Sequence, residues 1–171
     1  MENQNLNFDF VFLGQSVLKY QVPLDIFTAI NQIYEQNFHN LEPANSQLVG
    51  KIENEHSLFY HGADQTKMKN HNMLPKNVTN YFMTIFQHYL KWNKIKDYNT
   101  HLNSIWVNEM KQHEYNPAHV HRGMLYTGLS SVMILKVPST YGKEYSAGHI
   151  PQNGRLQILG ASNGQFAKID Y

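Results

Sequence analysis

Two histidines separated by one residue, His119 and His121, are the side chains in this sequence whose type and spacing could do chemistry together. On a β-strand, residues i and i+2 point to the same face, so both imidazole rings would be directed to one side. Imidazole ligates Fe(II), Zn(II), Cu(II) and Ni(II), so the pair predicts a site for one divalent transition-metal ion. The alternative is a pair of polar strand residues that face solvent.

The composition restricts what else could hold such an ion. The chain has 10 His and no Cys, which excludes disulfides, thiolate ligands and a Cys nucleophile. Any metal must therefore be held by imidazole nitrogen and by oxygen. The remaining histidines have no partner at ligand spacing: His39, His56, His61, His71, His88, His101, His113 and His149.

The residues around the pair follow a recognisable order. Trp106-Val-Asn108 precedes a loop, then Asn116-Pro-Ala-His-Val-His-Arg-Gly123, then Leu129-Ser-Ser-Val-Met-Ile-Leu-Lys-Val-Pro138. This order resembles a family of 2-oxoglutarate- and Fe(II)-dependent oxygenases that is common in marine cyanobacterial phages and is related to prolyl 4-hydroxylases. The resemblance covers residues 102–171, and the N-terminal part matches only in general character.

The resemblance implies a double-stranded β-helix, or jelly roll, that binds Fe(II), 2-oxoglutarate and O2. Oxidative decarboxylation of 2-oxoglutarate would be coupled to hydroxylation of a prolyl, other peptidyl or small-molecule substrate. His119 would be the first iron ligand. His121 occupies the place where most of the superfamily has a carboxylate, so an all-histidine site would carry one less negative charge and hold Fe(II) less tightly.

Three residues would contact the cosubstrate if the resemblance holds. Lys136, in register with Val132 and Ile134, is expected to bind the distal carboxylate of 2-oxoglutarate. The alternative is a strand-end lysine whose ammonium reaches water. Asn116 and, more weakly, Tyr115 are expected to offer polar contacts, although Asn116 is equally consistent with a turn before Pro117. Trp106 is expected in the core.

The hydropathy pattern predicts an α+β chain with an N-terminal strand, two packed helices and a run of short strands. One domain is expected over 1–171, mainly helical over 1–99, with the first half of a jelly roll over 100–171. Asn40 to Pro75 shows no sustained period apart from the apolar patch Ser57–Tyr60. The predicted elements are extended chain over Phe10–Val22, helices over Leu24–Phe38 and Asn77–Trp92, and strands over Leu102–Val107, Leu129–Val137, Gly154–Leu159 and Gln165–Tyr171.

The second metal-ligating histidine and the arginine of the family come later than this chain extends, so the jelly roll is expected to be incomplete. Three explanations stay open: a longer protein, a third ligand elsewhere with His149 the only downstream histidine, or a decayed relative without turnover. In each case we expect poor or no 2-oxoglutarate turnover by the chain alone. An exposed last strand would also allow a homodimer through edge pairing.

Net charge and hydropathy argue against some partners. Lys and Arg number 14 against 13 Asp and Glu, and no basic block would attract nucleic acid. No apolar stretch could span a bilayer and no signal peptide is apparent, so we expect a cytoplasmic protein, in the host cytoplasm if it is phage-encoded. Two alternatives remain: a catalytically inactive jelly-roll structural or interaction module of phage type with an incidental histidine pair, and a cupin-like Zn or Ni protein.

Overall fold

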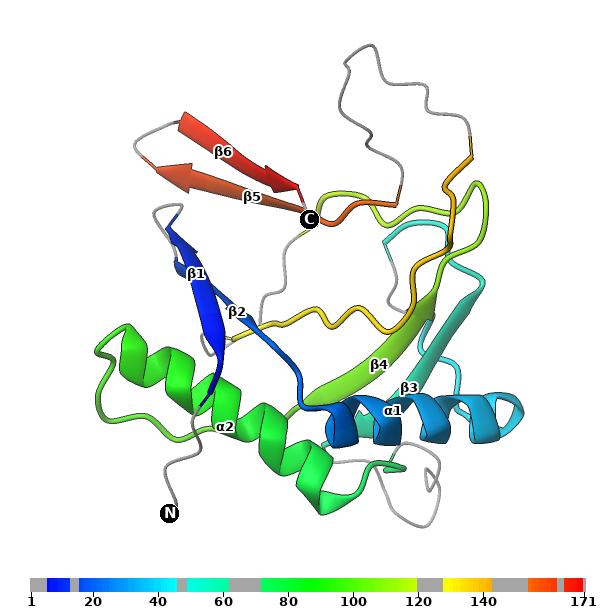
Figure 1. The fold of residues 1–171 in the computed structure, drawn as a ribbon, viewed down its shortest axis with the longest axis horizontal. Coiled ribbons are helices and arrows are strands. Elements are labelled where there is room, and N and C mark those ends of the chain that lie inside the picture. Colours follow the sequence, from blue (N-terminus) through cyan, green and yellow to red (C-terminus); the bar gives the residue numbers. More distant parts are fainter. Residues whose placement is uncertain are drawn as a thin grey trace. The chain divides into compact units, whose positions relative to one another are not determined.

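The computed structural model of this chain has a mixed α+β architecture, as the sequence predicts (Figure 1). Its strands pair into three small antiparallel sheets, and the described residues form no closed barrel. The jelly roll and the single domain stay predictions. Two compact units are distinguished, Val22–Leu129 and residues 1–21 with 130–171, and each is considered by itself. The structure describes residues 6–12, 16–45, 49–61, 72–119, 128–142, 154–162 and 165–170.

The first helix, α1, spans Leu24–Asn37 and continues as the 3-10 turn η1, Phe38–Asn40. Pro23 precedes it, at a place where a missing N–H costs nothing. The prediction of a helix from Leu24 to Phe38 is confirmed, but its buried face is only partly as expected. Ile26 and Ile30 are buried, whereas Leu24 is 77% exposed because it stands in the first turn.

The second helix, α2, spans Lys76–Trp92, within one residue of the prediction. Its apolar residues recur at three- and four-residue steps, which places them on one face. After Trp92, the backbone N–H of Asn93 bonds to the carbonyl of Tyr89 at 3.0 Å, and Lys94 takes a left-handed conformation that ends the helix. The buried apolar residues, most of them on the two helices, are Ile26, Ile30, Leu41, Ile52, Leu58, Val78, Tyr81, Phe82, Ile85 and Leu90.

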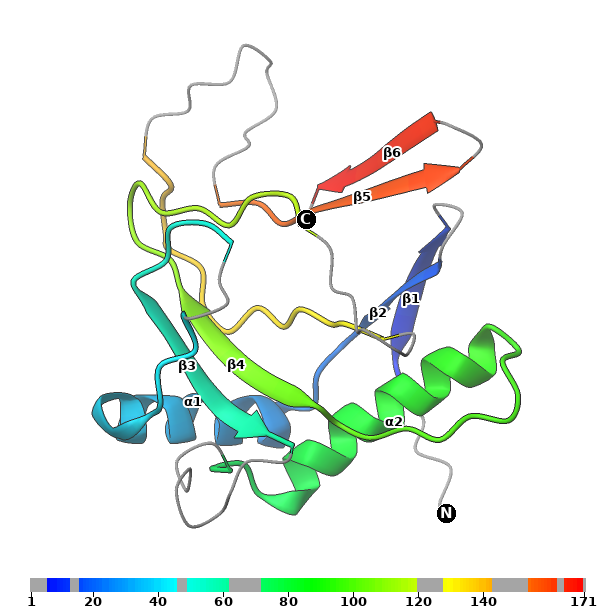
Figure 2. The same cartoon turned by 180° about the vertical axis from the view of Figure 1, so that it is seen from behind.

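Strands β3 (Asn54–Tyr60) and β4 (Ser104–Glu109) form an antiparallel pair with a register shift between Ser57 and Phe59. β4 follows the predicted strand with a shift of two residues. β3 was not predicted as a strand, since polar residues fill its first half. Helix α1 crosses one face of this pair, in front of the strands in Figure 1 and behind them in Figure 2.

The other unit contains two hairpins. Strands β1 (Phe8–Phe12) and β2 (Ser16–Tyr20) pair antiparallel. The extended chain predicted over Phe10–Val22 is confirmed within these two strands, but their pairing with each other was not predicted. Strands β5 (Gln157–Ser162) and β6 (Gln165–Asp170) also pair antiparallel, three residues later than the prediction for the first and in agreement for the second.

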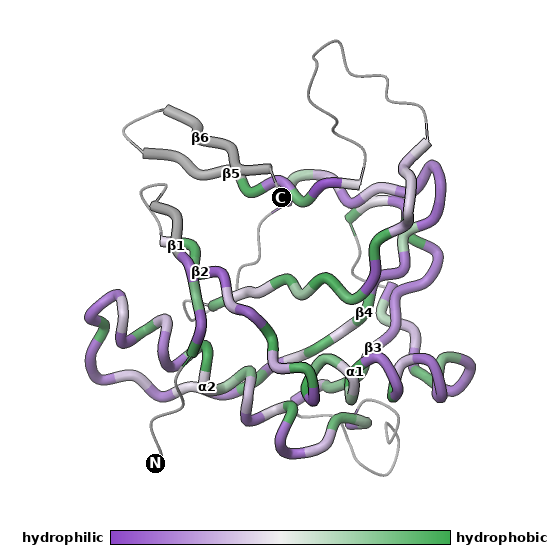
Figure 3. Tube along the Cα trace, in the orientation of Figure 1, coloured by the Kyte–Doolittle hydropathy of each residue, from purple (hydrophilic) through white to green (hydrophobic). Residues whose placement is uncertain are grey.

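The strand predicted over Leu129–Val137 is not formed. Residues 128–142 contain no helix or strand, although the part from Val132 to Leu135 is apolar and lies in the green portion of this stretch in Figure 3. Val132, Ile134 and Val137 are 56 to 63% exposed. β-branched residues favour extended chain, but a strand also requires a ladder partner, and none is found within the described part of the chain.

A helix that spans a bilayer must be long and apolar over about 20 residues. Neither described helix combines enough length with enough apolar character to pass through a membrane.

Candidate functional site

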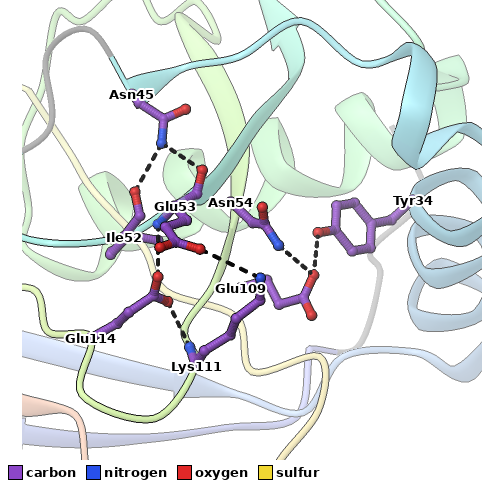
Figure 4. A network of polar contacts seen from close by, with 8 residues as sticks. All are labelled: Tyr34, Asn45, Ile52, Glu53, Asn54, Glu109, Lys111 and Glu114. Carbon is purple, nitrogen blue, oxygen red and sulfur yellow. Dashed lines mark hydrogen bonds and ion pairs between the residues drawn. The ribbon is translucent and has the colours of Figure 1, made fainter.

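The segment between the end of β4, at Glu109, and His119 is held in place by hydrogen bonds to the carboxylate of Glu114. One Glu114 oxygen accepts from the backbone N–H of Glu53 at 2.9 Å and the other from that of Lys111 at 2.6 Å. The Lys111 ammonium lies 3.7 Å from the Glu53 carboxylate (Figure 4). The backbone donor of Lys111, followed by that of Glu53, lowers the pKa of the Glu114 carboxyl, so its ionised form closes this loop.

One residue further on, Tyr115 is paired with Lys51. The Lys51 N–H donates to the Tyr115 carbonyl at 2.9 Å, and the Tyr115 N–H donates to the Lys51 carbonyl at 3.0 Å. Gly50 makes this approach sterically feasible. Its φ is +142°, and a Cβ at this position would lie 2.5 Å from the Tyr115 oxygen and 2.7 Å from Cδ of Pro117. The chain four residues before His119 is thus held against residue 50.

His119 itself is exposed, and its Nδ1 lies 2.7 Å from the carbonyl oxygen of Pro117. A carbonyl oxygen only accepts, so the contact implies that Nδ1 carries a proton. A neutral imidazole protonated on Nδ1 has its lone pair on Nε2. Metal-ligating histidines usually show this arrangement, with the other ring nitrogen donating to a carbonyl or carboxylate. The tautomer that this contact favours is therefore compatible with metal ligation through Nε2.

The predicted cosubstrate residues divide between the two units. Tyr115 and Asn116 share the loop of His119, and both are exposed, Tyr115 by 58%. Lys136 belongs to the unit that contains residues 130–171. Its side chain is exposed, which is also what we expect if its ammonium simply reaches water. The structure thus brings Tyr115 and Asn116 together with His119.

The remaining predicted positions cannot be compared in this way. His121 and His149 lie outside the described residues. Among the residues that are described, no group of three or more His, Asp or Glu side chains is close enough to hold a metal ion.

A polar cluster lies where α1 meets the β3–β4 pair. The Tyr34 hydroxyl donates to the Glu109 carboxylate at 3.2 Å, and the Asn54 amide lies 3.5 Å from the same oxygen (Figure 4). Burial, and then the negative charge of Glu109, raises the pKa of Tyr34 well above its ordinary value. His56 packs beside it against Phe38, with ring centroids 4.7 Å apart. These contacts fix α1 to the strands and are structural.

The opposite face of the β3–β4 pair carries polar groups that the sequence did not point to. Glu55 is only 6% exposed, and among the residues that the structure describes neither its Oε2 nor the Oδ1 of Asn108 has a hydrogen-bond partner. Trp106 is also on this face and is 38% exposed, so its expected place in the core is wrong. No periodic signal over Asn40 to Pro75 marks Glu55. The Trp-X-Asn order in β4 is the sequence feature that could have drawn attention to this face.

Two exposed histidines that are distant in sequence also meet. The ring centroids of His61, just after β3, and His101, just before β4, are 5.1 Å apart. Their separation along the chain conceals this proximity. Two imidazoles at this distance can contribute background metal binding, which any test of His119 has to control for.

No protein-family model, curated protein or solved structure matches the chain in comparisons with known proteins. The resemblance of residues 102–171 to the oxygenase family therefore stays a prediction. Function has to be inferred from the residues of this chain and from that resemblance.

Proposed function

We propose that this chain is an Fe(II)- and 2-oxoglutarate-dependent dioxygenase that hydroxylates a prolyl, other peptidyl or small-molecule substrate, with His119 as an iron ligand. The observation that carries the proposal is the 2.7 Å contact between Nδ1 of His119 and the Pro117 carbonyl. That contact favours the tautomer whose Nε2 lone pair can ligate a metal. The order of residues around His119 supports the choice of Fe(II) over other ions.

The chain's own residues have distinct tasks under this proposal. Gly50 allows the close backbone approach that positions the segment before His119. His121 contributes the second imidazole. Tyr115 and Asn116 donate hydrogen bonds to carboxylate oxygens of 2-oxoglutarate. Bound Fe(II) supplies the redox chemistry that couples O2 reduction to decarboxylation of the 2-oxo acid.

An anaerobic titration with Fe(II) and 2-oxoglutarate tests this function. A 2-oxo acid that chelates Fe(II) gives a visible charge-transfer band, and we expect this band in the full chain. The starting protein should carry H61A and H101A, so that the exposed histidine pair does not contribute. Adding H119A should abolish the band.

The matched control is H113A, which removes another exposed imidazole from the same loop, six residues earlier. We expect H113A to keep the band. An unchanged titration in the H119A variant would remove His119 from the site and with it the basis of the proposal.

A catalytically inactive interaction module is the second candidate, in which His119 and His121 are incidental. The exposure of Val132, Ile134 and Val137 favours it, because several large apolar residues exposed within one segment can mark a contact surface. Metal analysis of the purified protein separates the two candidates. The module would contain no iron or other transition metal, and H119A would not change that content.

A further inference from the structure

The face of the β3–β4 pair opposite α1 is the starting point. Side chains alternate between the two faces of a strand, and directly opposed residues share a face. His56, opposite Val107, packs against Phe38 after α1, so this parity points to the helix. Glu55, opposite Asn108, therefore points to the other side, together with Ser57 and Trp106, which also oppose each other.

Glu55 and Asn108 form a narrow cross-strand pair. The carbonyl of Glu55 accepts from the N–H of Ala44 at 2.9 Å, so the backbone groups of Glu55 point away from β4. In an antiparallel ladder, such a pair exchanges no backbone hydrogen bonds and its side chains approach most closely. The carboxyl of Glu55 and the amide of Asn108 are thus held side by side.

Both groups present acceptors that no donor satisfies within the described part of the chain. Glu55 is only 6% exposed, and neither its Oε2 nor the buried Oδ1 of Asn108 has a hydrogen-bond partner among the described residues. Burial raises the pKa of the Glu55 carboxyl, because the loss of water penalises its charged form. Buried acceptors without donors are rare in folded proteins, and two adjacent ones indicate a ligand that supplies the donors.

We propose that Glu55 and Asn108 bind a cationic nitrogen donor, the ammonium or guanidinium group of a substrate. An ammonium has three N–H donors, so one group can serve both oxygens and neutralise the carboxylate. Trp106 lies on the same face of β4, two residues before Asn108. Its indole can pack against the cation or its alkyl chain. Only the identification of this ligand as the substrate rests on the proposed dioxygenase function.

Binding of simple probes tests the site without iron. The full chain is titrated with n-butylammonium and, as a neutral isostere, n-butanol, while NMR follows the side-chain amide of Asn108 and the carboxyl carbon of Glu55. We expect both signals to shift with butylammonium and not with butanol. The E55Q variant should bind butylammonium at least about tenfold more weakly, since a charged acceptor is lost. E35Q, which removes an exposed carboxylate on α1, should bind normally.

Two peptides identify the source of the cation. They differ only in a central lysine or norleucine, each flanked by glycines with blocked ends. Tighter binding of the lysine peptide than of butylammonium would assign a peptidyl substrate, and equal binding a small amine. The proposal is overturned if neither cationic probe shifts the Asn108 signal, or if E55Q binds butylammonium as well as the wild type does. In that case, the alternative is that a protonated Glu55 carboxyl donates a hydrogen bond to Asn108.

The two proposals fail separately. H119A should leave butylammonium binding unchanged, because the probe needs no metal. E55Q should leave the Fe(II) and 2-oxoglutarate band in place. Loss of amine binding in the presence of that band would contradict the cation site alone.

Discussion

Replacement of Gly50 by alanine should detach the loop that carries His119. An alanine Cβ would lie 2.5 Å from the Tyr115 carbonyl oxygen and 2.7 Å from Cδ of Pro117. Both neighbours belong to the backbone or to a proline ring, so neither can swing aside. The two segments must separate, which breaks the reciprocal hydrogen bonds between Lys51 and Tyr115 at 2.9 and 3.0 Å.

The magnitude follows from these losses. Two backbone hydrogen bonds contribute about 1 kcal/mol each. A φ of +142° disfavours alanine by roughly another 1 kcal/mol. The sum is about 3 kcal/mol, which in a chain of this size lowers the melting temperature by about 6 to 12 °C. Release of the loop should also weaken metal binding at His119.

Thermal unfolding followed by circular dichroism is the assay, and G128A is the matched control. Gly128 has no atom within 4 Å of its ideal Cβ position and no positive φ, so alanine there should change stability by less than about 0.5 kcal/mol. If G50A melts within about 1 °C of G128A, the close approach of Gly50 to Tyr115 is not a feature of the folded chain.

Three further substitutions probe the polar groups. E114Q should lower the melting temperature at pH 7. Because the pKa of Glu114 is lowered on folding, the stabilisation is present above its unfolded pKa and is lost as pH falls through the folded one, so E114Q and the wild type should converge in acid. Y34F removes the 3.2 Å bond to Glu109 and should cost about 1 kcal/mol, seen in urea unfolding. E55Q should raise the melting temperature by about 2 to 4 °C at pH 7. Because burial raises the pKa of Glu55, the stability of the wild type falls as pH rises through that pKa. The difference in melting temperature between E55Q and the wild type should therefore shrink in acid.

The helices were predictable because their apolar residues recur at three- and four-residue steps, a local pattern that can be read directly from the sequence. The apolar steps of α2 repeat over its whole length, and its boundaries agree with the prediction within one residue. β3 lacks such a pattern. Its first half reads Asn, Glu, His, Ser, and only tertiary contacts bury it, through α1 on one face and residues Glu42 to Ala44 along one edge.

Strand predictions failed where pairing, which is not local, decides the outcome. Residues 129–137 have the composition of a strand but no ladder partner in the described structure. Extended chain over Phe10–Val22 is predictable from the sequence, but the pairing of β1 with β2 is not. The candidate site shows the same division. His119 could be proposed as a site residue from its neighbours in the sequence, but the contribution of Gly50 depends on a contact between segments far apart in sequence.

The most direct test of the central claim is a nitrogen NMR experiment on the His119 ring. In the H61A/H101A background, the metal-free protein should show the tautomer with the proton on Nδ1. Addition of Zn(II), a diamagnetic stand-in for Fe(II), should then shift Nε2 of His119, because that atom carries the lone pair. A proton on Nε2, or a His119 ring that Zn(II) leaves unchanged at saturation, would contradict the assignment of this residue as a metal ligand.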